Sequence, residues 1–275
     1  MASDLLARLG LSLPVIQAPM AGGATPPDFI AACMNLGLLG SLGAAYLAPP
    51  AIEEQVAAIR ARSAGPLNIN LFLPCGEAPR QGVVEAMLDF LGPLHAAAGL
   101  PAPRLPEPAH PDFAGQLAAL RRLRPEMASF VFACPDPAMV AALKAEGMVV
   151  VGAATHPAEA EAVAAAGVDA IVAQGAEAGA HRATFIGSFE AAQVPTLDLV
   201  EQMVARLDLP VIAAGGIMDG ADVRAALDRG AAMAQIGTAL LRAPESGIPD
   251  AHKAALGRAD GAPTRLIREW SGRAA

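Results

Sequence analysis

The chain has 275 residues, of which 54% are hydrophobic and 17% are charged, and its formal net charge is -8. This length and composition predict a globular protein with a large core, and they exclude an intrinsically disordered chain. The acidic balance, with a sequence pI of about 5.1, argues against binding of nucleic acid, which depends on clustered lysine and arginine.

Short apolar runs rich in β-branched residues alternate along the chain with alanine-rich stretches of helical preference, such as residues 158–166 and 221–229. This alternation predicts repeated βα units and a parallel sheet, and eight such units close a (β/α)8 TIM barrel. We therefore predict a single α/β domain over residues 1–275. In chain order, the predicted strands are Pro14–Ala18, Leu38–Leu42, Leu67–Phe72, Ala128–Ala133, Met148–Ala153, Ala170–Gln174, Pro210–Ala214 and Ala232–Ile236.

A proline-rich insertion interrupts this rhythm after the third strand, at about residues 73–125. Helices near Val83–Ala98 and Pro111–Leu123 are predicted to flank a stretch that proline keeps from forming continuous helix or strand. In a barrel, an insertion after a strand lies over the mouth, so this one is a candidate lid or substrate wall. A solvated surface loop is the alternative. The prolines are Pro93, Pro101, Pro103, Pro106, Pro108 and Pro111.

Glycine turns follow the seventh and eighth predicted strands, at Gly215, Gly216 and Gly237. Without a Cβ, the backbone amides there can approach an anion closely, and the helix that follows adds its positive end. Paired turns at these two strands form the phosphate site that is frequent in TIM barrels. The sequence therefore predicts a ligand that carries phosphate, although a single glycine pair would usually be a turn or tight packing.

His181 lies in the loop expected after the sixth strand, at the end of the barrel where active sites are found. A histidine there can accept a carbon-bound proton near neutral pH, because its ordinary pKa is about 6.5. Glu177 in the same loop could act as a second acid or base, but a solvated or helix-capping carboxylate is favoured. A structural or exposed role is assigned to the other histidines, His95, His110, His156 and His252.

Side-chain amides form a third group of candidates, after the first strand and within the third. An amide supplies both a donor and an acceptor, as the polar edge of a flavin or a ribityl hydroxyl requires. Asparagine is disfavoured in strands, so Asn70 is expected to keep a polar contact, either with a ligand or with a neighbouring strand. Asn68 shares its face, and the sequence does not choose between the two. The first segment comprises Gln17, Ala18, Pro19 and Met20.

The cysteines and the N-terminal residues indicate the cellular compartment of the protein. Cys33, Cys75 and Cys134 form neither a C-x-x-C pair nor an even framework, which predicts free thiols in a reducing compartment. Residues 1–13 lack the apolar stretch of a secretory signal, and no uncharged apolar stretch reaches the roughly 20 residues of a membrane span. We therefore expect a cytoplasmic protein without a membrane partner. No acidic cluster suggests a metal, and no lysine at a strand end suggests a Schiff base.

Together these motifs resemble the nitronate monooxygenase family, formerly the 2-nitropropane dioxygenases, of the bacterial class I type. The resemblance implies an FMN-bound barrel that oxidises alkyl nitronates with molecular oxygen, giving a carbonyl compound and nitrite. It covers nearly the whole chain, through Pro14-Val-Ile-Gln-Ala-Pro-Met-Ala-Gly, Leu67-Asn-Ile-Asn-Leu-Phe, Gln174-Gly-Ala-Glu-Ala-Gly-Ala-His, Ala213-Ala-Gly-Gly-Ile-Met-Asp-Gly and Gln235-Ile-Gly-Thr.

Under this resemblance the family's catalytic base falls on His181, which would remove the α-proton of a neutral nitroalkane, whereas a nitronate arrives already deprotonated. The partners implied are the small-molecule substrate and O2, and the oligomeric state is left open, a homodimer included. The implied FMN contacts are Asn70, Gln174, Gly179, Gly216, Gln235, Ile236, Gly237 and Thr238.

Three features depart from the family's pattern. Ala180 replaces the second glycine of Gly-Gly-His, which matters if that position needs a positive φ. Val131 replaces the histidine of Ser-Phe-His-Phe-Gly, which would lie near the site. The sequence also ends soon after the Ser-Gly-Arg motif at Ser271–Arg273, where the family usually continues.

Two other functions compete with the monooxygenase. Related FMN barrels with similar motifs reduce enoyl thioesters or quinones with NAD(P)H, so a reductase is the main alternative. A non-catalytic FMN-binding barrel is a further alternative, because of Ala180, Val131 and the short C-terminal part. By analogy with the family, the segments Gln17–Met20 and Asn70–Phe72 and the long insertion after the third strand favour the monooxygenase.

Overall fold

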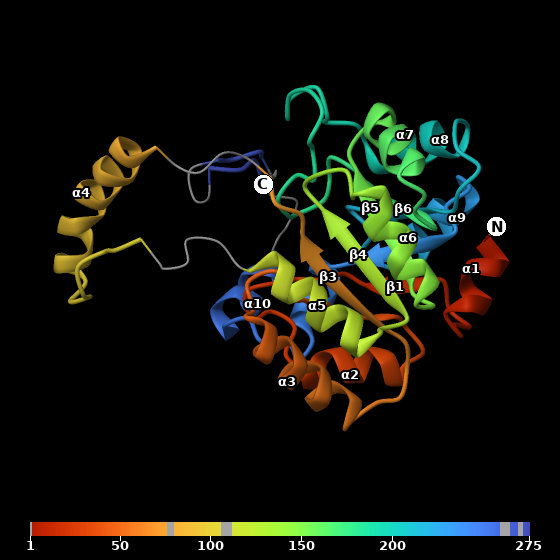
Figure 1. Cartoon of the computed structure of the whole chain (residues 1–275), viewed down its shortest axis with the longest axis horizontal. Helices are drawn as coiled ribbons and strands as arrows, with labels where there is room; N and C mark the ends of the chain where they lie inside the picture. The colour runs from red at the N-terminus through yellow and green to blue at the C-terminus, as the bar shows by residue number, and fades with distance from the viewer. Residues whose placement is uncertain (1, 76–79, 106–111, 259–264, 269–271) are drawn as a thin grey trace.

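The computed structural model describes residues 2–75, 80–105, 112–258, 265–268 and 272–275. Within these ranges, strands and helices alternate along the chain (Figure 1). The strands are β1 (Val15–Gln17), β2 (Gly40–Gly43), β3 (Leu67–Phe72), β4 (Met127–Val131), β5 (Val149–Ala154), β6 (Ala170–Gln174), β7 (Val211–Ala214) and β8 (Met233–Ile236). The helices are α1 (Ala2–Arg8), α2 (Pro27–Asn35), α3 (Pro49–Arg60), α4 (Gln81–Ala97), α5 (Phe113–Leu123), α6 (Pro137–Ala145), α7 (Pro157–Ala165), α8 (Thr196–Val204), α9 (Gly220–Asp228), the 3-10 helix η1 (Thr238–Arg242) and α10 (Asp250–Gly257).

The eight strands form one parallel sheet in the order β1-β8-β7-β6-β5-β4-β3-β2. Ile16 of β1 pairs with Leu39 just before β2, so the two ends of the sheet meet and the barrel is nearly closed. All the predicted strands are confirmed, and β3 and β6 have the predicted bounds. The architecture is therefore α/β and resembles a TIM barrel, as expected from the alternating sequence pattern.

Alternate residues of strands β4 to β8 enter two different hydrophobic cores. In β5, Val149 and Val151 belong to the cluster inside the barrel, whereas Val150 packs in the layer between the strands and the helices. Leu5 and Leu9, at α1 and just after it, join the inner cluster and are almost fully buried. Both faces of the sheet are thus covered, and most strand residues are accordingly apolar.

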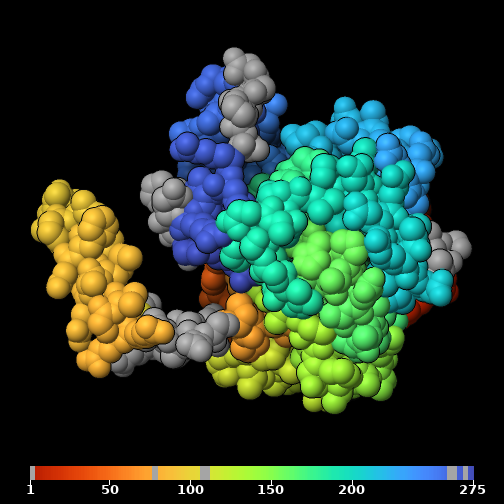
Figure 2. All heavy atoms as spheres, turned by 90° about the horizontal axis from the view of Figure 1, so that it is seen from above, coloured from red at the N-terminus to blue at the C-terminus, as the bar shows by residue number. Residues whose placement is uncertain are grey.

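The insertion after β3 contains a helix that stands apart from the barrel. Both views show α4 separated from the main body (Figures 1 and 2), and none of its described residues is buried. The chain returns with α5, where Gln116 donates to the carbonyls of Ala45 at 3.1 Å and Leu47 at 2.8 Å. The two predicted helices are confirmed, although Pro106, Pro108, His110 and Pro111 lie outside the described residues. A lid or wall role for the insertion stays a prediction.

Long apolar helices of the kind that cross a bilayer are absent from the part of the chain that the structure describes.

Candidate active site

The turn after β7 has a backbone that requires glycine. Gly215 has φ +121° and Gly216 has φ +68°, a region that other residues rarely adopt. A Cβ on Gly215 would lie 2.8 Å from the backbone nitrogen of Ala178, and one on Gly216 would lie 2.9 Å from the Cβ of Glu177. The turn therefore packs directly against the loop that follows β6, which carries His181.

The turn after β8 completes the same end of the barrel. A Cβ on Gly237 would lie 3.4 Å from the Cβ of Ala18 and 3.6 Å from the sulfur of Met20, which is ordinary contact. A Cβ on Gly179 would lie 3.3 Å from Oγ1 of Thr238. The loops after β1, β6, β7 and β8 thus meet, as the sequence prediction of one phosphate site at this end requires.

The helix after β7, α9, was predicted to offer its positive end to an anion, but carboxylates of the chain already occupy its first amides. The side chain of Asp219 accepts hydrogen bonds from the amides of Ala221 at 2.8 Å and Asp222 at 3.0 Å, and it forms a capping box with Asp222. These carboxylates satisfy the first amides of α9 and oppose its positive end. The first amides of α9 are therefore less available to an anion than the amides of the turn itself. The Asp-x-x-Asp spacing in the sequence could have revealed this cap.

His181 is held in place through its own backbone. The side chain of Gln174, at the end of β6, donates to the carbonyl of His181 at 3.0 Å and accepts from the amide of Ala183 at 2.7 Å. The imidazole is half-buried, and its pKa is lowered from 6.5 by burial and, secondarily, by the positive charge of Arg273. A histidine with a lowered pKa is neutral at neutral pH and can accept a proton.

Arg182 is a buried residue that the sequence reasoning missed. Its side chain is 1% exposed and donates to the carbonyls of Gly175 at 2.5 Å, Gln174 at 3.1 Å and Ala192 at 2.8 Å. Burial lowers the pKa of this guanidinium, but its ordinary value is so high that the charge is retained. Arg182 therefore joins the two ends of the loop that carries His181.

Glu177 has the helix-capping role that was favoured. Its carboxylate accepts from the backbone amide of Thr196 at 2.8 Å and from the hydroxyl of the same residue at 2.7 Å. Thr196 is the first residue of α8. Because this oxygen is engaged at a helix start, the carboxylate is explained without a role in proton transfer.

The amide side chains of the predicted flavin contacts have protein partners. Gln17 is fully buried; it accepts from the amide of Ser41 at 2.7 Å and donates to the carbonyl of Ala18. Asn70 donates to the hydroxyl of Ser129 at 3.0 Å. Asn68, two residues earlier in β3, donates to the hydroxyl of Ser41 at 3.2 Å. These contacts hold neighbouring strands together, and contact of Gln17, Asn70 and Gln174 with a flavin stays a prediction.

A row of aromatic rings leads toward His181. The ring centroids of Tyr46 and Phe72 are 5.4 Å apart, those of Phe72 and Phe132 are 4.5 Å apart, and those of Phe132 and His181 are 6.4 Å apart. Phe132 has φ +83°, an uncommon conformation for a bulky residue. This strained residue directly follows β4, and its ring joins the loops of β3 and β6.

The departure at position 180 has no backbone consequence. Among the described residues other than glycine, positive φ values occur at Arg124 and Phe132, and Ala180 is not one of them. The methyl group of Ala180 is therefore compatible with the loop. Val131, in place of the family's histidine, is the last residue of β4 and pairs with Phe72.

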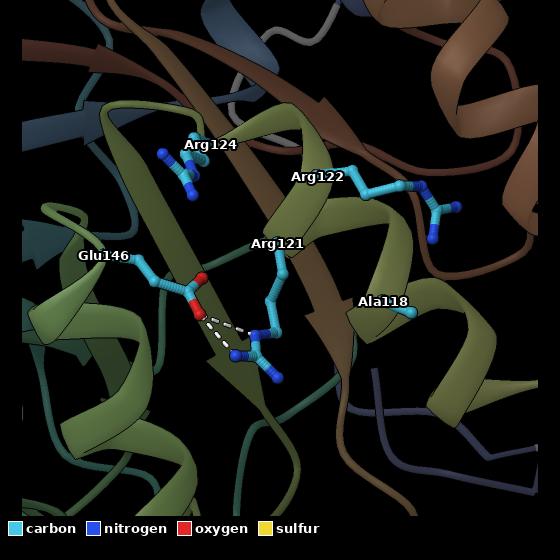
Figure 3. Close-up of a pocket in the computed structure, with 5 residues that line it drawn as sticks. All are labelled: Ala118, Arg121, Arg122, Arg124 and Glu146. Carbon is cyan, nitrogen blue, oxygen red and sulfur yellow. Dashed lines mark hydrogen bonds and ion pairs between the residues drawn. The ribbon is translucent and has the colours of Figure 1, made fainter.

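A surface pocket lies on another part of the molecule (Figure 3) and is lined by Ala118, Arg121, Arg122, Arg124 and Glu146. These residues come from the C-terminal ends of α5 and α6, which lie at the end of the barrel where strands begin. Arg121 donates to Glu146 at 2.8 Å, and Arg122 donates to Glu53 at 3.0 Å. Cations are favoured at helix C-termini, so this pocket is explained by structural charges.

Comparison with known proteins identifies the family. A sequence profile of the family described as nitronate monooxygenase matches residues 4–275. The chain belongs to the nitronate monooxygenase family. A nitronate monooxygenase from Pseudomonas aeruginosa is 41% identical over 270 residues, which are 97% of this chain and 77% of that protein. The family is one of flavoproteins, and the chain is accordingly an oxidoreductase.

Solved structures agree with this family. A nitroalkane oxidase from Streptomyces ansochromogenes is 39% identical and superposes with a TM-score of 0.88, over 98% of this chain and 78% of that one. FabK from Thermotoga maritima has a TM-score of 0.77 at 24% identity, over 99% of this chain and 73% of that one. The FabK likeness shows a shared fold alone.

Proposed function

We propose that this member of the nitronate monooxygenase family uses FMN to oxidise alkyl nitronates with O2, producing a carbonyl compound and nitrite. The observation that carries the proposal is the meeting of the loops after β1, β6, β7 and β8 at one end of the barrel, beside His181. Among these loops, Gly179 after β6 lies close to Thr238 after β8, and Gly216 after β7 packs on the loop that carries His181. A phosphate-anchored cofactor at these turns would have its reactive ring within reach of the imidazole.

The turns fit the phosphate of FMN. Successive positive φ values at Gly215 and Gly216 create a turn whose amides can face one anion. Gly237 has room for a Cβ against the protein, so its lack of a side chain leaves space for a ligand. We assign the phosphate to Gly216 and to the segment from Gln235 to Thr238. When bound, the flavin would supply electron transfer from the substrate to oxygen.

His181 would act as the base for neutral nitroalkanes. Burial and Arg273 keep the imidazole neutral, so it can receive the α-proton of a nitroalkane. A nitronate needs no such transfer. Phe72 and Phe132 would exclude water beside the imidazole and contact the alkyl part of the substrate. The surroundings are thus suited to a small substrate with one apolar and one charged end.

Anaerobic mixing tests the function against its alternatives. The purified protein should show flavin absorbance bands, and an alkyl nitronate should bleach them rapidly while NADH and NADPH do not. Rapid bleaching by a pyridine nucleotide would instead support the reductase of enoyl thioesters or quinones. A flavin that neither reagent reduces would support a binding protein without this chemistry.

A further inference from the structure

Two paired stretches, residues 265–268 and 272–275, here together called the hairpin, dock on the loop that carries His181. Ile267 and Ala275 exchange two backbone hydrogen bonds of 3.0 Å, which pairs the two sides of the hairpin. The amide of Arg182 then donates to the carbonyl of Ala274 at 2.7 Å, and Ala274 is fully buried. The residue next to His181 is therefore hydrogen-bonded to this hairpin.

Arg273 makes the most specific contacts between the hairpin and the loop. Its Nε donates to the carbonyl of Arg182 at 2.8 Å, and its Nη2 donates to the carbonyl of Thr184 at 2.6 Å. These two carbonyls flank Ala183, whose amide is bound by Gln174. One planar guanidinium thus fixes two points of the loop. The ammonium group of a lysine would hold both carbonyls less well.

The same guanidinium lies over an aromatic ring beside the imidazole. The centre of the Arg273 guanidinium is 4.0 Å from the centroid of Phe132, whose ring is in edge contact with His181. The ring face attracts the cation and holds it near the imidazole. Arg273 therefore touches both the backbone of the loop and the ring that supports His181.

We propose that Arg273 is a positioning residue for His181, which fixes its loop and supplies the positive charge beside its imidazole. The proposal rests on the proposed function insofar as His181 is the base. Among the described residues, Glu159 raises the pKa of Arg273 by its charge, Arg182 donates to carbonyls of the loop, and Glu177 caps α8.

The sign of the effect follows from this arrangement. Burial is the larger cause of the lowered pKa of His181, and Arg273 is the second. Removal of the charge should therefore raise the pKa of His181 toward its ordinary value of 6.5 without restoring it fully. The neutral imidazole would then be less populated at slightly acidic pH.

Two variants separate charge from geometry. Arg273→Gln removes the charge, whereas Arg273→Lys keeps it but cannot donate to both carbonyls in the same plane. NMR titration of the His181 imidazole in the flavin-loaded protein, with His181→Asn for assignment, should show a raised pKa in Arg273→Gln and a value near wild type in Arg273→Lys. Hydrogen exchange at residues 182–185 should be faster in both, by about tenfold for one lost hydrogen bond to a charged group.

Arg268→Gln is the matched control, because Arg268 lies on the same hairpin and bonds to Glu190 at 2.6 Å. It should leave the titration of His181 unchanged. An unchanged titration in Arg273→Gln, or equal shifts in Arg273→Gln and Arg268→Gln, would overturn the proposal. Neither the NMR titration nor the hydrogen exchange requires turnover. A failure of the proposed function would therefore be seen in a different assay, as nitroalkane oxidation that does not depend on His181.

Discussion

Replacement of Arg182 by methionine tests whether the buried guanidinium holds the active-site loop. Methionine has a similar length but cannot donate to the carbonyls of Gly175, Gln174 and Ala192, which would lose three hydrogen bonds. Each lost hydrogen bond costs about 1 kcal/mol, because relief of the buried charge offsets larger values, and the carbonyl of Gly175 keeps the amide of Ala178 as a donor at 3.2 Å. We therefore expect the free energy of unfolding to fall by about 3 kcal/mol.

For a protein of this size, that loss corresponds to a decrease in Tm of roughly 6 °C, measurable by circular dichroism. Arg206→Met is the matched control. Arg206 is 49% exposed and donates to the carbonyl of Gln202, so its loss should change stability by no more than about 0.5 kcal/mol. Equal changes of Tm in the two variants would refute the reasoning that Arg182 anchors the loop.

Three further predictions concern the chemistry of the site. His181→Asn should reduce oxygen consumption with neutral nitroalkanes by about 100-fold or more while nitronate turnover survives better; equal losses would contradict its role as the base. Gly237→Ala should fold with unchanged Tm, because its Cβ meets ordinary contacts, but should retain less FMN by absorbance; full retention would count against the phosphate placement. The kcat/KM for nitroalkanes should increase with pH and level off by neutral pH, because the lowered pKa leaves His181 neutral above 6.5. A midpoint above 6.5 would argue against that assignment.

The strands were predictable because their signal is local. The bounds of β3 and β6 follow from apolar runs bounded by turn residues. β2 begins two residues later than predicted, at Gly40, because Leu39 pairs with Ile16 at the seam of the barrel rather than within β2. A helix-capping role was among those that the sequence favoured for Glu177, although the helix that it caps, α8, begins 19 residues later.

The residues that hold the site in place were not predictable, because their roles depend on contacts between residues that are distant in the sequence. Arg273 and Arg182 are separated by 91 positions, and no sequence pattern links them. The positive φ of Phe132 is imposed by its surroundings and has no local signature. Gln174 was predicted as a cofactor contact, which stays a prediction, but its hydrogen bonds to the backbone around His181 were not foreseen.

The docking of the hairpin has a consequence for the order of folding. Most barrel strands pair with a neighbour in the sequence, and β1 closes the barrel against β8, whereas the loop after β6 gains hydrogen bonds from residues 273 and 274, which follow β8 in the chain. Such long-range closure is entropically costly and forms late. During synthesis, the sheet can therefore assemble while this loop is still unanchored. The loop that carries His181 would then acquire its anchoring hydrogen bonds only after β8 has been made.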